Sequence, residues 1–311
     1  MGRQGGWMLG MLVVALWVAG RPLTGQQPVF RAETSLVTVG VTVRDRAGSP
    51  ITDLTKADFT VLEDGRAQTV THFTRGDAEN GSVETHVGLL LDTSGSMGED
   101  IGLARSAAIR FLNTLSDAAD MTLVDFDTEV RVARYTQQDF PRMVERIRGR
   151  KASGMTAMYD ALGVYLDGAA EADGRTILVL FTDGGDTKSS IAFKDVLTLL
   201  RASNVTVYSV GFLDHQPASI RSEQRLRLVQ MAAETGGEAV FPLSMKEIEK
   251  AYDRVVEGIR AQYSLGYVST NPARDGRWRR LEVKVARDAV RSSRDLRLQS
   301  RKGYFAPLEK P

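Results

Sequence analysis

The run from Val87 to Leu91 is apolar without alternation and ends abruptly in Asp92, Ser94 and Ser96. Such a run predicts a strand that is covered on both faces, as in a parallel sheet between helices. Ligands of these sheets bind at the carboxyl ends of the strands. One carboxylate and two hydroxyls offer only oxygen ligands, which hard cations such as Mg²⁺ prefer. The segment therefore predicts a metal-binding loop, although an ordinary turn and helix cap also explain such a cluster.

Two further segments place oxygen ligands at the same edge of the predicted sheet. Thr156 lies at the start of an apolar helix that we expect over residues 156–171, and the buried run from Thr176 ends in Asp183. A helix cap is the alternative role for Thr156, and a turn aspartate is the alternative for Asp183. Together with the first loop, three oxygen-bearing loops are predicted to converge.

With these residues the sequence resembles the von Willebrand factor A (VWA) domain, and the resemblance covers roughly residues 85–261. The metal-ion-dependent adhesion site of that family uses D-x-S-x-S, a threonine on a second loop and an aspartate on a third. The matching residues are Asp92, Ser94, Ser96, Thr156 and Asp183. The whole chain also resembles a narrower bacterial group, the VWFA-related proteins, which add strands before and after this domain.

The resemblance implies recognition through an incomplete coordination shell. In the family the serines bind the cation directly, and the threonine and aspartates bind it directly or through water. One position is left for an Asp or Glu carboxylate of a protein partner. Mg²⁺, with oxygen ligands at about 2.0–2.1 Å and exchangeable waters, is the expected cation, and Mn²⁺ or Ca²⁺ are alternatives. Because hydroxyls leave the cation under-neutralised, an acidic partner group is attracted.

The first 25 residues have the pattern of a secretory signal peptide, since Arg3 precedes a short apolar run over residues 7–19. Cleavage is expected after Gly20 or Gly25, and an uncleaved anchor is the alternative. We therefore expect an exported protein, periplasmic, cell-surface or secreted, with no membrane span in the mature chain. The sequence contains no cysteine, which excludes disulfides and a lipoprotein anchor.

The segments on either side of the central region have β character. Valines alternate with polar residues from Val37 to Val43, and Asp64-Gly65 favours a tight hairpin. Strands are predicted at 37–43, 59–62 and 69–73, and again at 262–268, 281–285 and 296–304. Because each end has few strands, we expect one discontinuous β-sandwich built from residues 29–75 and 262–307. Two separate small β modules are the competing arrangement.

The predicted fold class is therefore α/β, a doubly wound, Rossmann-like VWA domain with an added β-sandwich-like region. The expected parts are a signal peptide (1–25), an N-terminal β region (26–80), the VWA domain (84–261) and C-terminal β strands (262–307). Within the domain we expect strands at 121–126, 130–135, 205–212 and 238–241, and helices at 101–115, 140–147, 191–203, 223–235 and 245–261.

The sequence gives little support to an enzyme. His72, His86 and His215 are its three imidazoles, and no nucleophile elbow, HExxH or P-loop pattern is present. A metal-assisted hydrolase is the alternative, with Asp160 or Asp186 as the general base. The formal net charge of +1 does not suggest a nucleic-acid partner.

An arginine-rich segment from Arg274 to Lys302 supports a third interpretation, a structural envelope protein in which metal only stabilises the fold. This segment could face an anionic surface, or it could be a solvated sheet face whose charges discourage aggregation. Our principal prediction is an exported, metal-dependent protein-binding module. The partner, the preferred cation and the oligomeric state stay open.

Overall fold

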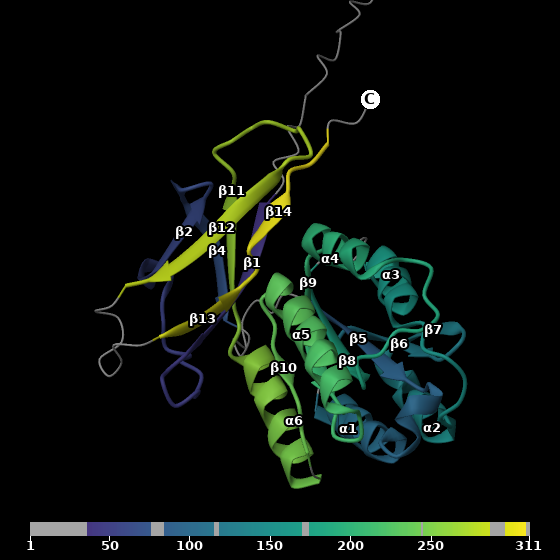
Figure 1. Cartoon of the computed structure of the whole chain (residues 1–311). Coiled ribbons are helices and arrows are strands. Elements are labelled where there is room, and N and C mark those ends of the chain that lie inside the picture. The colour runs from purple at the N-terminus through teal and green to yellow at the C-terminus, as the bar shows by residue number, and fades with distance from the viewer. Residues whose placement is uncertain are drawn as a thin grey trace, which may run out of the picture. The chain divides into compact units, whose positions relative to one another are not determined.

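The computed structural model describes residues 36–75, 84–114, 118–169, 174–243, 245–286 and 296–308, which belong to one compact unit (Figure 1). The predicted signal peptide lies outside the described residues. Among the helices that are described, none combines the length and the apolar character needed to cross a membrane.

A six-stranded sheet in the order β10-β9-β8-β5-β6-β7 forms the centre of the α/β region. Its strands are β5 (Thr85–Asp92), β6 (Asp120–Phe126), β7 (Val130–Tyr135), β8 (Arg175–Thr182), β9 (Val205–Gly211) and β10 (Ala239–Val240). All neighbouring pairs are parallel except β6 and β7. The unalternating apolar runs of β5 and β8 occupy the middle, where both faces of a strand are covered.

Helices cover both faces of this sheet, as Figure 1 shows. One face packs against α1 (Ile101–Thr114), α2 (Phe140–Gly149) and α6 (Met245–Arg260). The other packs against α3 (Met158–Ala169), α4 (Phe193–Ala202) and α5 (Ala218–Thr235). Alternate residues of β5 enter the two cores, with Leu89 in the first and Leu90 in the second. The predicted α/β fold class is confirmed.

Two four-stranded antiparallel sheets complete the described structure, in the orders β13-β1-β11-β4 and β14-β12-β2-β3. Their strands are β1 (Leu36–Arg44), β2 (Phe59–Glu63), β3 (Arg66–Gln68), β4 (Val70–Arg75), β11 (Tyr263–Val268), β12 (Trp278–Val285), β13 (Arg297–Ser300) and β14 (Gly303–Phe305). Strands from the two ends of the chain pair directly, β1 with β11 and β2 with β12. Val39, Val61 and Leu281 belong to one buried cluster, so the two sheets share a core.

The Asp64-Gly65 turn forms the predicted hairpin between β2 and β3, with positive φ at both residues. The strand predicted at 69–73 is found as β4, but it is not the hairpin partner of β2, because β3 takes that place and β3 and β4 belong to different sheets. The strand predicted at 296–304 divides into β13 and β14, which also lie in different sheets. In both places the chain crosses from one sheet to the other within two residues, a change that alternation of side chains does not reveal.

Three helices begin at other residues than predicted, and one of them, α4, begins at Phe193, two residues later than the expected 191. α3 starts at Met158 because the Thr156 carbonyl accepts the amides of Thr187 and Lys188 in another loop. α5 starts at Ala218, five residues earlier than the expected 223, because the Pro217 carbonyl already accepts an amide of the first turn. The early turns of α5 are largely exposed and therefore carry no apolar stripe.

A buried acid fastens the antiparallel edge of the central sheet. Asp125 on β6 is 0% exposed. Its carboxylate lies 2.8 Å from Arg131 Nε, 2.7 Å from Arg146 Nη2 and 2.9 Å from Arg150 Nε. These cations come from β7, from α2 and from the loop that follows α2. One carboxylate thus joins three neighbouring segments.

We expect Asp125→Ala to lower the free energy of unfolding by about 3 kcal/mol, because it leaves three partly buried guanidinium groups without their shared anion. Urea denaturation followed by circular dichroism measures this change. Glu145→Ala is the matched control, since Glu145 pairs with Arg148 at 2.7 Å on the surface. Glu145→Ala should lower the free energy of unfolding by less than about 0.5 kcal/mol. Equal effects of the two substitutions would contradict the assignment.

Candidate functional site

The five predicted ligand residues lie on three loops at the carboxyl ends of β5 and β8 and before α3. Asp92 is the last residue of β5, and Ser94 and Ser96 follow it around the short helix η2 (Gly95–Gly98). Thr156 lies in the loop before α3, and Asp183 directly follows β8. Because β5 and β8 are parallel neighbours, their carboxylates emerge at the same sheet edge.

Backbone hydrogen bonds hold the first loop against the loop that carries Thr156. The Gly95 amide donates to the Gly154 carbonyl at 3.0 Å, and the Ser153 amide donates to the Thr93 carbonyl at 2.9 Å. The approach is close, since a Cβ at Gly95 would lie 3.1 Å from the Gly154 carbonyl oxygen. The glycine in this motif therefore permits the two loops to touch.

Within the D-x-S-x-S loop the oxygen atoms turn toward one another. The Ser94 amide donates to Asp92 Oδ1 at 2.9 Å, and the hydroxyls of Ser94 and Ser96 lie 3.1 Å apart. Thr93 points elsewhere, with its hydroxyl donating to the Phe126 carbonyl at 3.0 Å. Asp92 and Ser94 are fully buried, whereas Ser96 is exposed. The cluster is thus open to solvent on the side of Ser96.

Asp92 is held in a place that disfavours its charge. Burial is the main cause that raises the pKa of its carboxyl to about 7, and the neighbouring Asp183 carboxylate adds to this effect. The Thr182 hydroxyl donates to Asp92 Oδ2 at 2.6 Å and, with Ser94, opposes the shift. Thr182 was not among the predicted site residues. The sequence did contain one indication of its role, since Thr182 is a hydroxyl residue at the end of the buried run from Thr176, directly before Asp183.

Asp183 has a hydrogen-bond donor on each oxygen. The Gly185 amide donates to Oδ1 at 2.9 Å, and Gln216 Nε2 donates to Oδ2 at 3.0 Å. Gln216 lies in the loop between β9 and α5 and was not predicted, since no sequence pattern connects it with Asp183. These two bonds orient the carboxylate.

Thr156 connects its loop to the segment after β8. Its amide donates to the Thr187 hydroxyl at 3.0 Å, and its carbonyl accepts the Thr187 amide at 2.9 Å. The side chain is 4% exposed. The three loops therefore form one hydrogen-bonded assembly. Over the described ranges, no group of three or more His, Cys, Asp or Glu side chains is arranged to hold a metal.

The residues considered for catalysis have structural partners. His86 lies within β5, which begins before the apolar run from Val87, and its Nδ1 lies 3.1 Å from Asp120 Oδ2. His215 Nδ1 lies 2.9 Å from Glu99 Oε2. Asp186 accepts the Tyr159 amide, and Asp160 accepts the Ser190 amide, both at 2.9 Å. These acids fix the loops around α3. His72, the third histidine, lies on β4 as expected.

The family model of the von Willebrand factor type A domain matches residues 86–254, more than half of the chain. The chain belongs to the von Willebrand factor type A family. The matched segment contains all five predicted site residues. No match was found among proteins with curated descriptions.

Solved structures of bacterial proteins resemble this chain at low sequence identity. The vWF domain of the type V pili tip protein Mfa5 from Porphyromonas gingivalis is 11% identical, with 57% of this chain and 97% of that chain covered and a TM-score of 0.47. A von Willebrand factor type A protein from Catenulispora acidiphila is 13% identical, with 90% of this chain and 75% of that chain covered and a TM-score of 0.47. The pilus adhesin SpaC from Lactobacillus rhamnosus GG is 10% identical, with 80% of this chain and 48% of that chain covered and a TM-score of 0.46.

Thr182→Val should lower the free energy of unfolding by about 2 kcal/mol, because it removes the donor to Asp92 and the acceptor of the Gly184 amide while keeping the shape. Chemical denaturation measures the loss. Ser209→Ala is the control, since the buried Ser209 hydroxyl has no hydrogen-bond partner among the described residues. That variant should be nearly neutral, and a larger loss there than at Thr182 would contradict the prediction.

Proposed function

We propose that this chain is a protein-binding module in which Asp92, Ser94, Ser96, Thr156 and Asp183 hold a divalent cation, most readily Mg²⁺. The partner is a protein that presents an Asp or Glu carboxylate. Two features support the proposal: VWA domains mediate protein–protein interaction, and the five oxygen-bearing residues lie on three loops that are hydrogen-bonded together.

The observation that carries the proposal is the buried Asp92 carboxylate beside Asp183. Two acids at the end of adjacent central strands repel one another, and burial adds to the cost of charging Asp92. A cation among them offsets both effects, and three nearby hydroxyls supply neutral oxygen ligands. The chemistry of the donor set therefore fits a hard divalent cation.

The bound cation supplies an electrophilic anchor for a carboxylate oxygen of the partner. The protein's own residues do the remaining work. The Gly185 amide and Gln216 orient Asp183, while Thr182 and the Ser94 amide orient Asp92. Because Ser96 is exposed and Met155 is 48% exposed, the partner approaches from this side and meets an apolar side chain beside the hydroxyls.

An exported location is part of the proposal and rests on the pattern of residues 1–25. We also propose that the chain is not an enzyme. In support, His86, Asp160 and Asp186 are engaged with neighbouring residues of the fold. A site that binds metal for stability alone is the competing function and is an outcome of the second experiment below.

Calorimetric titration of Mg²⁺, Mn²⁺ and Ca²⁺ into the protein should show saturable binding of at least one cation. Asp92→Ala and Thr156→Val should weaken it at least tenfold, because each removes a ligand. Asp214→Ala is the matched control, since Asp214 is an exposed acid in the neighbouring loop and pairs with Arg221. No binding by the folded wild-type protein would overturn the proposal, and Thr156→Val keeps the test valid if Asp92→Ala unfolds.

A pull-down with and without chelator then tests the partner. We expect proteins that are retained in Mg²⁺ and released by EDTA, and whose retention is lost after their acidic residues are amidated. If Mg²⁺ binds and raises the melting temperature but no retained protein depends on it, the site serves stability alone and the adhesion function is wrong.

A further inference from the structure

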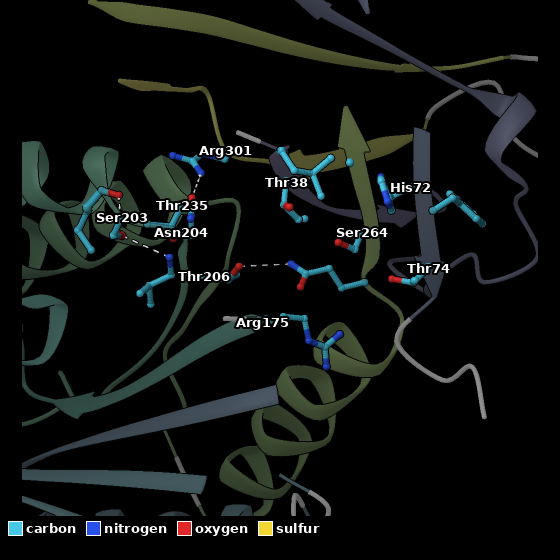
Figure 2. A pocket seen from close by; sticks show the side chains of 18 of the residues that line it. Thr38, His72, Thr74, Arg175, Ser203, Asn204, Thr206, Thr235, Ser264 and Arg301 are labelled. Carbon is cyan, nitrogen blue, oxygen red and sulfur yellow. Dashed lines mark hydrogen bonds between the residues drawn. The ribbon is translucent and has the colours of Figure 1, made fainter. Parts of the chain in front are cut away.

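A second polar site lies at the other end of the central sheet. A cavity of about 410 Å³ is bounded on one side by the amino-terminal ends of β8 and β9 and by the last residues of α4 and α5. On the other side lie β1, β4 and β11 of the antiparallel sheet. Figure 2 shows Thr38, Thr74 and Ser264 from these strands facing the region of Asn204 and Arg301. This cavity shares no residue with the carboxylate loops.

Arg301 is the feature of this cavity that most needs an explanation. It is 7% exposed, and burial lowers the pKa of its guanidinium to about 10. Its hydrogen bonds go to the Gly303 carbonyl at 2.8 Å, to Asn204 Oδ1 at 2.7 Å and to the Arg201 carbonyl at 3.1 Å. All three acceptors are neutral, and among the described residues no carboxylate forms an ion pair with it.

Hydrogen bonds to neutral acceptors offset only part of the desolvation free energy of a buried cation. The Arg201 carbonyl belongs to the end of α4, so its dipole contributes some negative potential. A guanidinium has five N–H donors, and the three bonds to protein leave donors for a further acceptor. The natural complement is an anionic oxygen group within the cavity.

The other charged residues that line the cavity do not neutralise Arg301. Arg175 contributes a second guanidinium, which donates to the Ile259 carbonyl at 3.0 Å. Glu234 also lines the cavity, but Arg201 donates to both of its oxygens at 3.0 Å and Lys302 Nζ lies 3.6 Å away. That acid is already paired with two cations, so it does not balance Arg301.

The remaining lining combines apolar side chains, such as Leu36 and Phe73, with polar groups that can contact the body of a ligand. Hydroxyls are supplied by Thr38, Ser264 and Thr206, and an amide is supplied by Gln262, which donates weakly to Thr206 at 3.5 Å. Gly40 makes room for this amide, since a Cβ there would lie 2.6 Å from Gln262 Nε2. The volume lies within the range of small-molecule sites, about 300–1,000 Å³.

We propose that this cavity is a binding site for a small hydroxyl-bearing organic anion, whose carboxylate or phosphate group pairs with Arg301. The hydroxyl and amide side chains contact the body of the ligand. The site is independent of the metal loops, so binding does not require a divalent cation. It joins strands from both ends of the chain to the α/β region and would stabilise their contact.

Calorimetry on the full chain in EDTA provides the test, with glucose 6-phosphate and glucuronate as probes and glucose as the neutral control. At least one anion should bind saturably and glucose should not. The two anions distinguish a phosphate from a carboxylate head group. No binding of either anion, or equal binding of glucose, would overturn the proposal.

Two variants locate the binding. Arg301→Gln should weaken it at least tenfold, and Ser264→Phe, which keeps Arg301 and fills the cavity, should do the same. Arg297→Gln is the matched control, because Arg297 is an exposed arginine on the adjoining strand β13 and its loss changes net charge equally. Circular dichroism confirms folding of each variant. If both Ser264→Phe and Arg301→Gln bind the anion as the wild-type protein does, the anion binds outside this cavity and the proposal is wrong.

Discussion

Electrostatic repulsion between two acids at the end of the central strand pair is the constraint around which the candidate site is built. Parallel pairing of β5 and β8 brings Asp92 and Asp183 to one edge, where burial makes the charge of Asp92 costly. The Ser94 amide and the Thr182 hydroxyl donate to Asp92 and reduce this cost, while the Gly185 amide and the Gln216 amide donate to Asp183. The proposed cation would further reduce the repulsion between the two carboxylates.

Three buried charges of the described residues differ in their surroundings. Asp125 has three arginines around it, Asp92 has hydrogen-bond donors, and Arg301 has neutral acceptors. Within the part of the chain that the structure describes, only Asp125 is paired with side chains of opposite charge. Both proposed ligands, a cation at one end of the sheet and an anion at the other, follow from that difference.

The sequence could predict what depends on local pattern. Unalternating runs identified β5 and β8, and the spacing of Asp92, Ser94 and Ser96 placed these residues on one loop. Thr182 and Gln216 were missed because their importance depends on which loops meet in space. The sheet changes between β3 and β4 and between β13 and β14 were missed for a similar reason, since a strand that changes sheets keeps its alternation. The apolar run began only at Val87, because the polar start of β5 hides its first pairing with β6.

The pairing of β1 with β11 also has a consequence for the order of folding. Leu54 and Tyr263, whose amide and hydroxyl are bonded in the β region, are 209 positions apart in the chain. Closing so long a loop is entropically costly unless the intervening residues are already compact. The α/β region, whose strands all lie between β4 and β11 in the chain, can fold first and shorten the effective separation of these partners. We therefore infer that β1 and β4 stay without their partner β11 until the α/β region has been synthesised, whereas β2 and β3 can pair at once.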